Sequence, residues 1–193
     1  DLYTETELDS KNLYVQQQAV ITWRLITRLN ISNPQFVQPQ IDGALVQDLG
    51  NRQYQRASSN GDVEHVIEQR YALFPQRSGT LEIPMQQFQV VENFMQRWSR
   101  GIIQQAQRQR IAQTEEQQLN VLPADNSQPG DWLPATAMDV AQDFTGLDKQ
   151  KARVGTSFTR IIRIRAEGLS AEQLPAIDMQ ADGIKAYSDK PQL

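Results

Sequence analysis

The stretch Ala-Val-Ile-Thr-Trp-Arg-Leu-Ile-Thr at residues 19–27 decides the fold that the sequence predicts. Ile21, Trp23 and Leu25 occupy alternate positions, and Arg24 falls between two of them. Successive side chains of a β-strand point to opposite faces, so this alternation buries one face and exposes the other. The stretch therefore predicts a half-buried strand with a tryptophan in the core.

The same period of two recurs in the segments that follow. Val63–Phe74 alternates apolar with polar residues, and Leu119–Pro123 forms a last alternating segment. Asn-Gly at 60–61 and Ser-Gly at 78–79 supply the positive φ angles that tight hairpins need. Short alternating strands separated by turn residues are typical of an antiparallel β-sandwich. We therefore expect a mostly β protein.

Residues 91–118 fit this pattern least well. Phe94, Trp98 and Ile102 recur at helical spacing among good helix formers, and Gly101 interrupts the run. Two interpretations stay open near 91–104, a short amphipathic helix or an irregular crossover. In either case a strand is expected to return from about residue 107 to residue 122.

A linker is predicted at residues 124–134, where proline, glycine and small polar residues concentrate. Such a composition is typical of domain boundaries. We therefore expect a first β-sandwich module at 1–123 and a second at 135–193, with strands of the second at 135–144 and 154–166.

An internal repeat relates the two modules. The apolar positions of one stretch fall on those of another: Val15, Ala19, Trp23 and Leu25 on Val154, Phe158, Ile162 and Ile164. With one residue of slack, the Asp-Gly pair at 42–43 falls on the pair at 182–183. Such repetition indicates two copies of one supersecondary unit. The first copy continues far beyond its Asp-Gly pair, so we expect the second module to lack its C-terminal strands and to leave sheet edges unpaired.

Composition narrows the classes of function. The chain has 193 residues, a net charge of −4 and a pI near 5.1, which disfavours nucleic acid as a partner because phosphate binding requires clustered cations. It contains no cysteine, which excludes disulfides and thiolate chemistry. No apolar run reaches the roughly 18–20 residues that span a bilayer, and no signal peptide opens the chain. We interpret the sequence as a mature or trimmed ectodomain of a longer protein.

No group of residues predicts catalysis. His65 is the single histidine, and on the apolar face of a strand a packed, hydrogen-bonded role is more frequent than that of a base or metal ligand. No G-x-S-x-G, G-x-G-x-x-G or Walker motif occurs in the chain. We therefore assign no catalytic, cofactor-binding or metal-binding residue, expect no cofactor, and expect that the protein is not an enzyme.

Two charged clusters have both a functional and a structural interpretation. Asp125, Asn126 and Asp131 in the linker can hold calcium, but turn formation explains them better because no EF-hand spacing is present. The four arginines between residues 97 and 110 can contact nucleic acid or lipid headgroups. A solvated strand face explains them better in a chain that is acidic as a whole.

Four segments together carry a resemblance over nearly the whole chain: Val63–Ile83, Asp131–Ala135, Gly168–Pro175 and Ala186–Asp189. They resemble the BatD family of bacterial oxygen-tolerance, or aerotolerance, proteins. The resemblance implies tandem immunoglobulin-like β-sandwich modules in the periplasm, with a signal peptide upstream and a membrane helix downstream. It also implies von Willebrand A-type domain membrane proteins of the same operon as partners, together with a MoxR-type ATPase. The family has no established catalytic residues, so none are transferred.

These observations lead to the expectation of a non-catalytic protein-interaction scaffold at the periplasmic face of the bacterial inner membrane, linked to oxygen or stress tolerance. A-type domains often bind a partner through a metal ion whose coordination is completed by a carboxylate of that partner. Asp42 and Asp182 are therefore the candidate partner contacts. Their structural role is an Asp-Gly turn. The alternative is a cell-surface carbohydrate-binding or adhesin module, which needs exposed coplanar aromatic side chains.

Overall fold

The computed structural model describes residues 1–193 except 99–100, 102, 128–129, 149–152, 191 and 193. Twelve strands and one short 3-10 helix make up the regular structure of the described residues, which confirms a mostly β protein. No described helix is long and apolar enough to cross a membrane. The chain divides into two compact units, Asp1–Asp125 and Asn126–Leu193. Gln128 and Pro129 of the expected linker lie outside the described residues.

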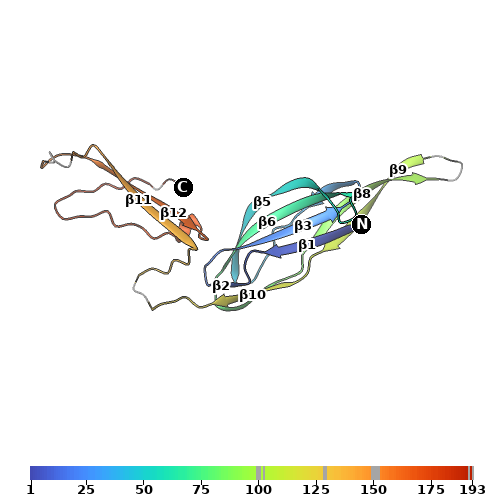
Figure 1. The fold of residues 1–193 in the computed structure, drawn as a ribbon, viewed down its shortest axis with the longest axis horizontal. Coiled ribbons are helices and arrows are strands. Elements are labelled where there is room, and N and C mark those ends of the chain that lie inside the picture. Colours follow the sequence, from blue (N-terminus) through green and yellow to red (C-terminus); the bar gives the residue numbers. More distant parts are fainter. Residues whose placement is uncertain (99–100, 102, 128–129, 149–152, 191, 193) are drawn as a thin grey trace. The chain divides into compact units, whose positions relative to one another are not determined.

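The first unit contains a four-stranded antiparallel sheet (Figure 1). Its order is β1-β3-β6-β5, formed by Leu2–Leu8, Ala19–Thr27, Val63–Pro75 and Ala44–Ala57. The two stretches with the clearest alternation, β3 and β6, are its central strands and pair from Ala19 opposite Leu73 to Thr27 opposite His65. Alternation therefore located the centre of this sheet.

Two three-stranded sheets complete the first unit. One has the order β2-β10-β7, formed by Asn12–Tyr14, Gln117–Leu122 and Gly79–Ile83, and the other has the order β4-β8-β9, formed by Ile31–Gln35, Gln87–Arg97 and Ile103–Gln113. The strand expected from 107 to 122 is thus two strands, β9 and β10. Between them, the Thr114 N–H donates to the Gln86 carbonyl at 3.0 Å and the Thr114 hydroxyl accepts from the Gln86 N–H at 2.9 Å.

Both interpretations considered near residues 91–104, a short helix and an irregular crossover, are wrong, because the described part of this segment belongs to the regular β8–β9 hairpin. Phe88, Val90 and Glu92 are buried at alternate positions of β8, so a period of two prevails over the helical spacing. Gly101 has a φ of 79°, a conformation that suits glycine at the turn between the strands.

The core of the first unit lies between its sheets. Trp23 is 1% exposed, which confirms its predicted place in the core. Its ring packs edge-to-face against Tyr71 of β6 at 5.5 Å and Phe88 of β8 at 6.3 Å. Because β6 and β8 belong to different sheets, this aromatic cluster joins them. The other large, fully buried apolar side chains are Leu13, Ile21, Leu25, Ile26, Leu73, Ile83 and Leu119.

The second unit is built on a two-stranded antiparallel sheet. β11, Ala137–Thr145, pairs with β12, Thr159–Glu167, and the 3-10 helix η1 follows at Ala171–Gln173. The prediction that the second strand begins at Val154 is wrong, because this side chain is fully exposed before the strand. A turn closed by the Thr156 N–H and the Arg153 carbonyl at 3.0 Å occupies that position instead.

Candidate functional site

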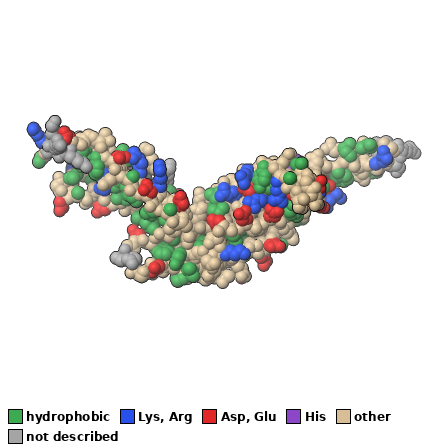
Figure 2. Space-filling model, viewed as in Figure 1, with side chains coloured by type: hydrophobic (Ala, Val, Ile, Leu, Met, Phe, Trp, Pro, Cys, Tyr) green, Lys and Arg blue, Asp and Glu red, His purple; other side chains and the backbone are tan. Residues whose placement is uncertain are grey.

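The outward face of the four-stranded sheet carries interleaved arginine and carboxylate side chains. The pleat that buries Trp23 and Leu25 directs Arg24 to the opposite face. Figure 2 shows red and blue side chains gathered over this sheet. We call this set the arginine–carboxylate ladder, and it comprises Tyr3, Glu5, Glu7, Arg24, Arg28, Arg52, Tyr54, Arg56, Glu64 and Glu68.

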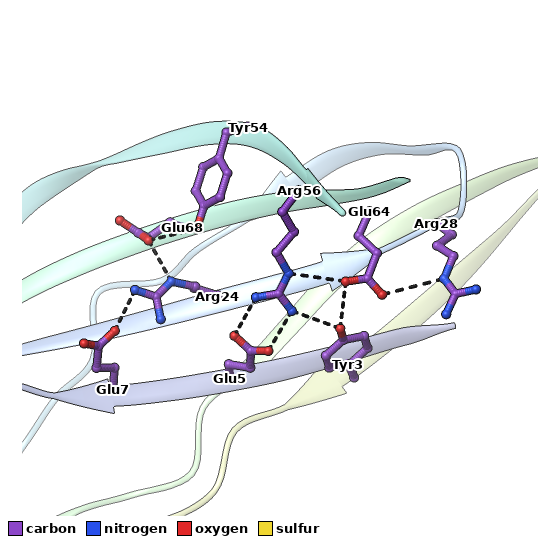
Figure 3. Close-up of polar contacts among 9 residues, drawn as sticks. All are labelled: Tyr3, Glu5, Glu7, Arg24, Arg28, Tyr54, Arg56, Glu64 and Glu68. Atoms are coloured by element: carbon purple, nitrogen blue, oxygen red, sulfur yellow. Dashed lines mark hydrogen bonds and ion pairs between the residues drawn. The ribbon is translucent and has the colours of Figure 1, made fainter. Parts of the chain in front are cut away.

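Glu68 on β6 is the first centre of the ladder. Its Oε2 accepts a hydrogen bond from Nε of Arg24 at 2.8 Å, and its Oε1 accepts one from Nε of Arg52 at 2.7 Å. The Tyr54 hydroxyl also donates to this carboxylate, at 3.3 Å. The covering side chains leave Glu68 only 1% exposed although it stands on the outward face. Arg24 extends the chain of contacts to Glu7 on β1, 2.7 Å away (Figure 3).

Glu64 is the second centre (Figure 3). The Tyr3 hydroxyl donates to its Oε2 at 3.0 Å, and Nε of Arg56 donates to the same oxygen at 3.3 Å. Nε of Arg28 lies 3.6 Å from the other oxygen. Arg56 also contacts Glu5 on β1, with Nη2 2.7 Å from Oε1. The ladder therefore ties all four strands together across their outer surface.

Hydrogen bonds from arginines lower the pKa of two ladder carboxylates, Glu5 and Glu68. Hydrogen bonding to Arg56 lowers the pKa of Glu5 below its ordinary value. Burial works to raise the pKa of Glu68, but the hydrogen bonds from Arg52 and Arg24 outweigh burial and lower that pKa. Both carboxylates are therefore ionised at neutral pH and are poor proton donors. This arrangement is suited to holding strands together rather than to general acid–base chemistry.

A hollow of about 430 Å³ lies at one end of the ladder, lined by Tyr3, Arg28, Arg56, Ala57, Ser58, Ser59 and Glu64. Its two guanidinium groups are already paired: Arg56 with Glu5 and Glu64, and Arg28 with Asp62. The hollow therefore offers an anion no cation that lacks a counter-charge. We assign no ligand to it.

Asp42 and Asp182 lie in turns of the same kind. In residues 41–44 and 181–184, the N–H of the fourth residue donates to the carbonyl of the first at 3.2 and 3.1 Å. The glycine that follows each aspartate has a φ of 81° or 79°, the conformation that the third position of a type II turn requires. The repeated Asp-Gly pairs therefore share one local structure, one in each unit.

The surroundings of the two aspartates differ. Oδ2 of Asp42 accepts a hydrogen bond from Nη2 of Arg77 at 2.6 Å, while its side chain remains 92% exposed. Asp182 is exposed as well. Within the described part of the chain, no three His, Cys, Asp or Glu side chains group as a metal site, the linker residues Asp125 and Asp131 included. The predicted partner-contact role of both aspartates stays a prediction.

The basic stretch on the β8–β9 hairpin contains an ion-paired cluster at its base. Nε of Arg108 and Nε of Arg110 lie 2.6 and 2.7 Å from Oε2 of Glu92. Hydrogen bonds from these arginines lower the pKa of Glu92 to about 2. Arg97 is exposed further along the hairpin, and Arg100 lies outside the described residues. The sequence did not identify Glu92 as a partner because the register of β8 against β9 was not predicted.

His65 is exposed, so its predicted place on a buried apolar face is wrong. His65 lies on the same face of β6 as the buried Ile67. It pairs with Thr27 and Gln55 close to the ends of their strands, where the core no longer covers its side chain. The Gln55 amide lies 3.5 Å from its Nδ1. The structure thus gives His65 a surface position.

Comparison of the chain with protein-family models, with curated proteins and with solved structures finds no match.

Proposed function

We propose that this chain is a non-catalytic interaction ectodomain at the periplasmic face of the bacterial inner membrane, related to the BatD family and linked to oxygen or stress tolerance. The observation that carries the proposal is the arginine–carboxylate ladder. Its two central carboxylates, Glu64 and Glu68, are covered on an open sheet face by arginines from neighbouring strands. Ion-paired carboxylates of this kind are poorly suited to general acid–base catalysis. The sheet face that carries them is broad and hydrated, and it is available to other proteins.

An immunoglobulin-like sandwich is the finer fold that we propose for the first unit. The order β1-β3-β6-β5 corresponds to strands A-B-E-D of that fold. If β7 and β8 are the two halves of strand F, and β9 and β10 those of strand G, then β4 is strand C of the opposite sheet. The parallel pairing of β2 with β10 fits a first strand that divides its pairing between both sheets. Strand order thus supports the proposal.

For the second unit we propose the N-terminal part of a second such module. β11 and β12 pair antiparallel as β1 and β3 do, and the turn at 181–184 repeats the turn at 41–44. Alternating residues place Met138, Val140 and Phe144 on one face of β11, and these side chains are 40–60% exposed. An uncovered apolar face supports a unit whose second sheet is formed by chain outside these 193 residues.

The proposed partners are the von Willebrand A-type domain proteins that the BatD resemblance implies. The carboxylate of Asp42 or Asp182 would complete the coordination of a metal ion held by the partner. Carboxylate oxygens are suitable ligands for such an ion. Both side chains are exposed at the tips of turns, where a flat partner surface can reach them.

A pull-down of the neighbouring A-type domain by the purified chain tests this function. We expect binding that EDTA abolishes and that the double variant D42N/D182N abolishes as well. Asp62, an exposed carboxylate near the turn of another hairpin, supplies the matched control D62N, which leaves binding intact. Absence of binding both with and without EDTA would contradict the proposal.

No observation on the described residues favours the alternative, a carbohydrate-binding or adhesin module. Trp23 is buried, and the exposed aromatic side chains of the described residues, Tyr3, Tyr14, Trp98, Phe144 and Tyr187, belong to separate segments. Phe144 contacts Phe158, but the two rings are inclined by 51° and are not coplanar. A sugar platform needs such rings side by side on one surface.

A further inference from the structure

The β8–β9 hairpin extends beyond the sheet to which it belongs. β4 pairs with β8 only as far as Ile31 opposite Glu92, whereas β8 and β9 stay paired up to Arg97 opposite Ile103. At about 3.3 Å per residue, the ribbon reaches roughly 20 Å from Glu92 to Trp98. Figure 1 shows this ribbon extending past the other strands of the first unit. We call the part beyond Glu92 the arm.

Large apolar side chains are exposed near the end of the arm. Met95 is 68% exposed, Trp98 56% and Ile103 54%. Met95 and Ile103 lie on one face of the ribbon, since Ile103 pairs with Arg97 two residues further along, whereas Phe94 lies on the opposite face. Phe94 is half-buried, with the Arg108 guanidinium 5.0 Å over its ring, so apolar groups lie on both faces and the most exposed ones lie toward the end of the ribbon. A folded protein partner would need a deep socket to cover them, whereas a lipid interface surrounds an inserted tip on every side.

The charge of the arm is opposite to that of the rest of the protein. Because Glu92 pairs with Arg108, the arm spans residues 93–107. These residues contain Arg97 and Arg100 and no Asp or Glu, a charge of +2, and the remaining residues carry −6, which together give −4. Arg97 is directly opposite Ile103, next to the apolar tip. Guanidinium groups bind phosphate oxygens in a bidentate manner. A projecting arm can bring this cation to an anionic surface.

We propose that the tip of the arm docks on an anionic lipid bilayer, with Met95, Trp98 and Ile103 in the headgroup region and Arg97 on the lipid phosphates. Tryptophan favours the membrane–water interface. The outer edges of a two-stranded ribbon carry unpaired backbone groups, so the arm lies in the interface and does not enter the hydrocarbon. This inference does not depend on the proposed partner, which would bind at the turn aspartates.

Flotation of the purified 193-residue chain with lipid vesicles tests the inference. We expect binding to vesicles of phosphatidylcholine with phosphatidylglycerol, weaker binding to phosphatidylcholine alone, and loss of binding in high salt. R97Q weakens binding to the anionic vesicles about fivefold, the effect of one cation near such a surface. The triple variant M95S/W98S/I103S weakens it at least roughly tenfold because apolar area no longer leaves water.

Matched controls separate docking from general effects. Ile111 is 58% exposed on β9 but lies outside the tip, so I111S leaves vesicle binding unchanged. R77Q, which removes an exposed cation that pairs with Asp42, also leaves it unchanged. Circular dichroism of every variant should match the parent, since the tip lies outside the core. The inference is overturned if the parent binds neither vesicle, if I111S loses as much binding as the triple variant, or if the tip variants impair only binding to an acidic protein.

Discussion

The β1–β3 pair of the first unit and the β11–β12 pair of the second have the same local structure and opposite burial. Both pairs are antiparallel. The pairing of β1 with β3 begins with Leu2 opposite Thr27, and that of β11 with β12 begins with Ala137 opposite Glu167. Trp23 in β3 is 1% exposed, whereas its counterpart in the sequence repeat, Ile162 in β12, is only half-buried. Alternation is thus sufficient to make strands and to pair them, but burial needs a second sheet.

The core residues show the same contrast. Among the described residues, every apolar side chain of the buried cluster belongs to the first unit. That unit has three sheets whose side chains meet, and hydrophobic stabilisation grows with the apolar area that the sheets remove from water. A lone two-stranded sheet is at best marginally stable in water. The difference therefore predicts where substitutions matter.

The largest effect is expected from W23A compared with I162A. Trp23 fills the centre of the aromatic cluster, so its removal should lower the free energy of unfolding by about 3–5 kcal/mol. I162A at the aligned position should cost less than about 1 kcal/mol because the site is not enclosed. Urea denaturation followed by circular dichroism measures both. Equal losses would show that the second unit is buried in solution.

Acid should act on the first unit through several carboxylates at once. The pKa values of Glu5, Glu68 and Glu92 are lower in the folded protein than in the unfolded chain, so their stabilisation is complete above about pH 4.5 and is lost as the pH falls through the folded values, about 2 for Glu92. The protection factors of β3 and β6 amides against hydrogen exchange, which are corrected for the intrinsic pH dependence of exchange, should therefore fall as the pH is lowered below about 4.5. Protection factors that stay constant as the pH falls below about 4.5 would contradict a stabilising role of these carboxylates.

Removal of one ladder centre should have an intermediate effect. E68Q removes the anion that Arg24 and Arg52 share, although Arg24 keeps its contact with Glu7. It should lower the free energy of unfolding by about 1–3 kcal/mol, as for hydrogen bonds to charged groups. The second unit supplies the comparison, because Asp143 and Arg163 form an exposed ion pair on β11 and β12. D143N should cost about 0.5 kcal/mol or less. Thermal melts of both variants measure the difference, and a larger loss for D143N would reverse the comparison.

The two repeated turns should give the smallest difference. G43A and G183A both force alanine to a positive φ and should each cost about 1 kcal/mol locally. At Gly43 a Cβ would also come within 2.8 Å of Nε of Arg77, but that side chain is flexible and can move, while nothing lies near Gly183. Amide exchange at the turns should respond alike in both variants. A large effect at only one turn would show that the two are not equivalent.

Part of the arginine–carboxylate ladder could be seen in the sequence as charged residues at the positions between the apolar ones of a predicted strand. Glu64 and Glu68 fall between the apolar positions of the predicted strand 63–74, whereas β1, which carries Glu5 and Glu7, was not predicted because its alternate positions include Thr4 and Thr6. What alternation did not reveal is the partner of each charge. Arg56 contacts Glu5, 51 residues away in the chain, and only the strand order β1-β3-β6-β5 brings them together.

The sequence by itself determined a mostly β protein, the central strands, the buried Trp23 and the repeated Asp-Gly turns, because a period of two and turn preferences are properties of short segments. The tertiary structure alone decided the β8–β9 hairpin in place of a helix, the exposure of His65 and Val154, and the pairing of each arginine with its carboxylate. These depend on which strands become neighbours and in what register, and that choice is made by packing between residues far apart in the chain.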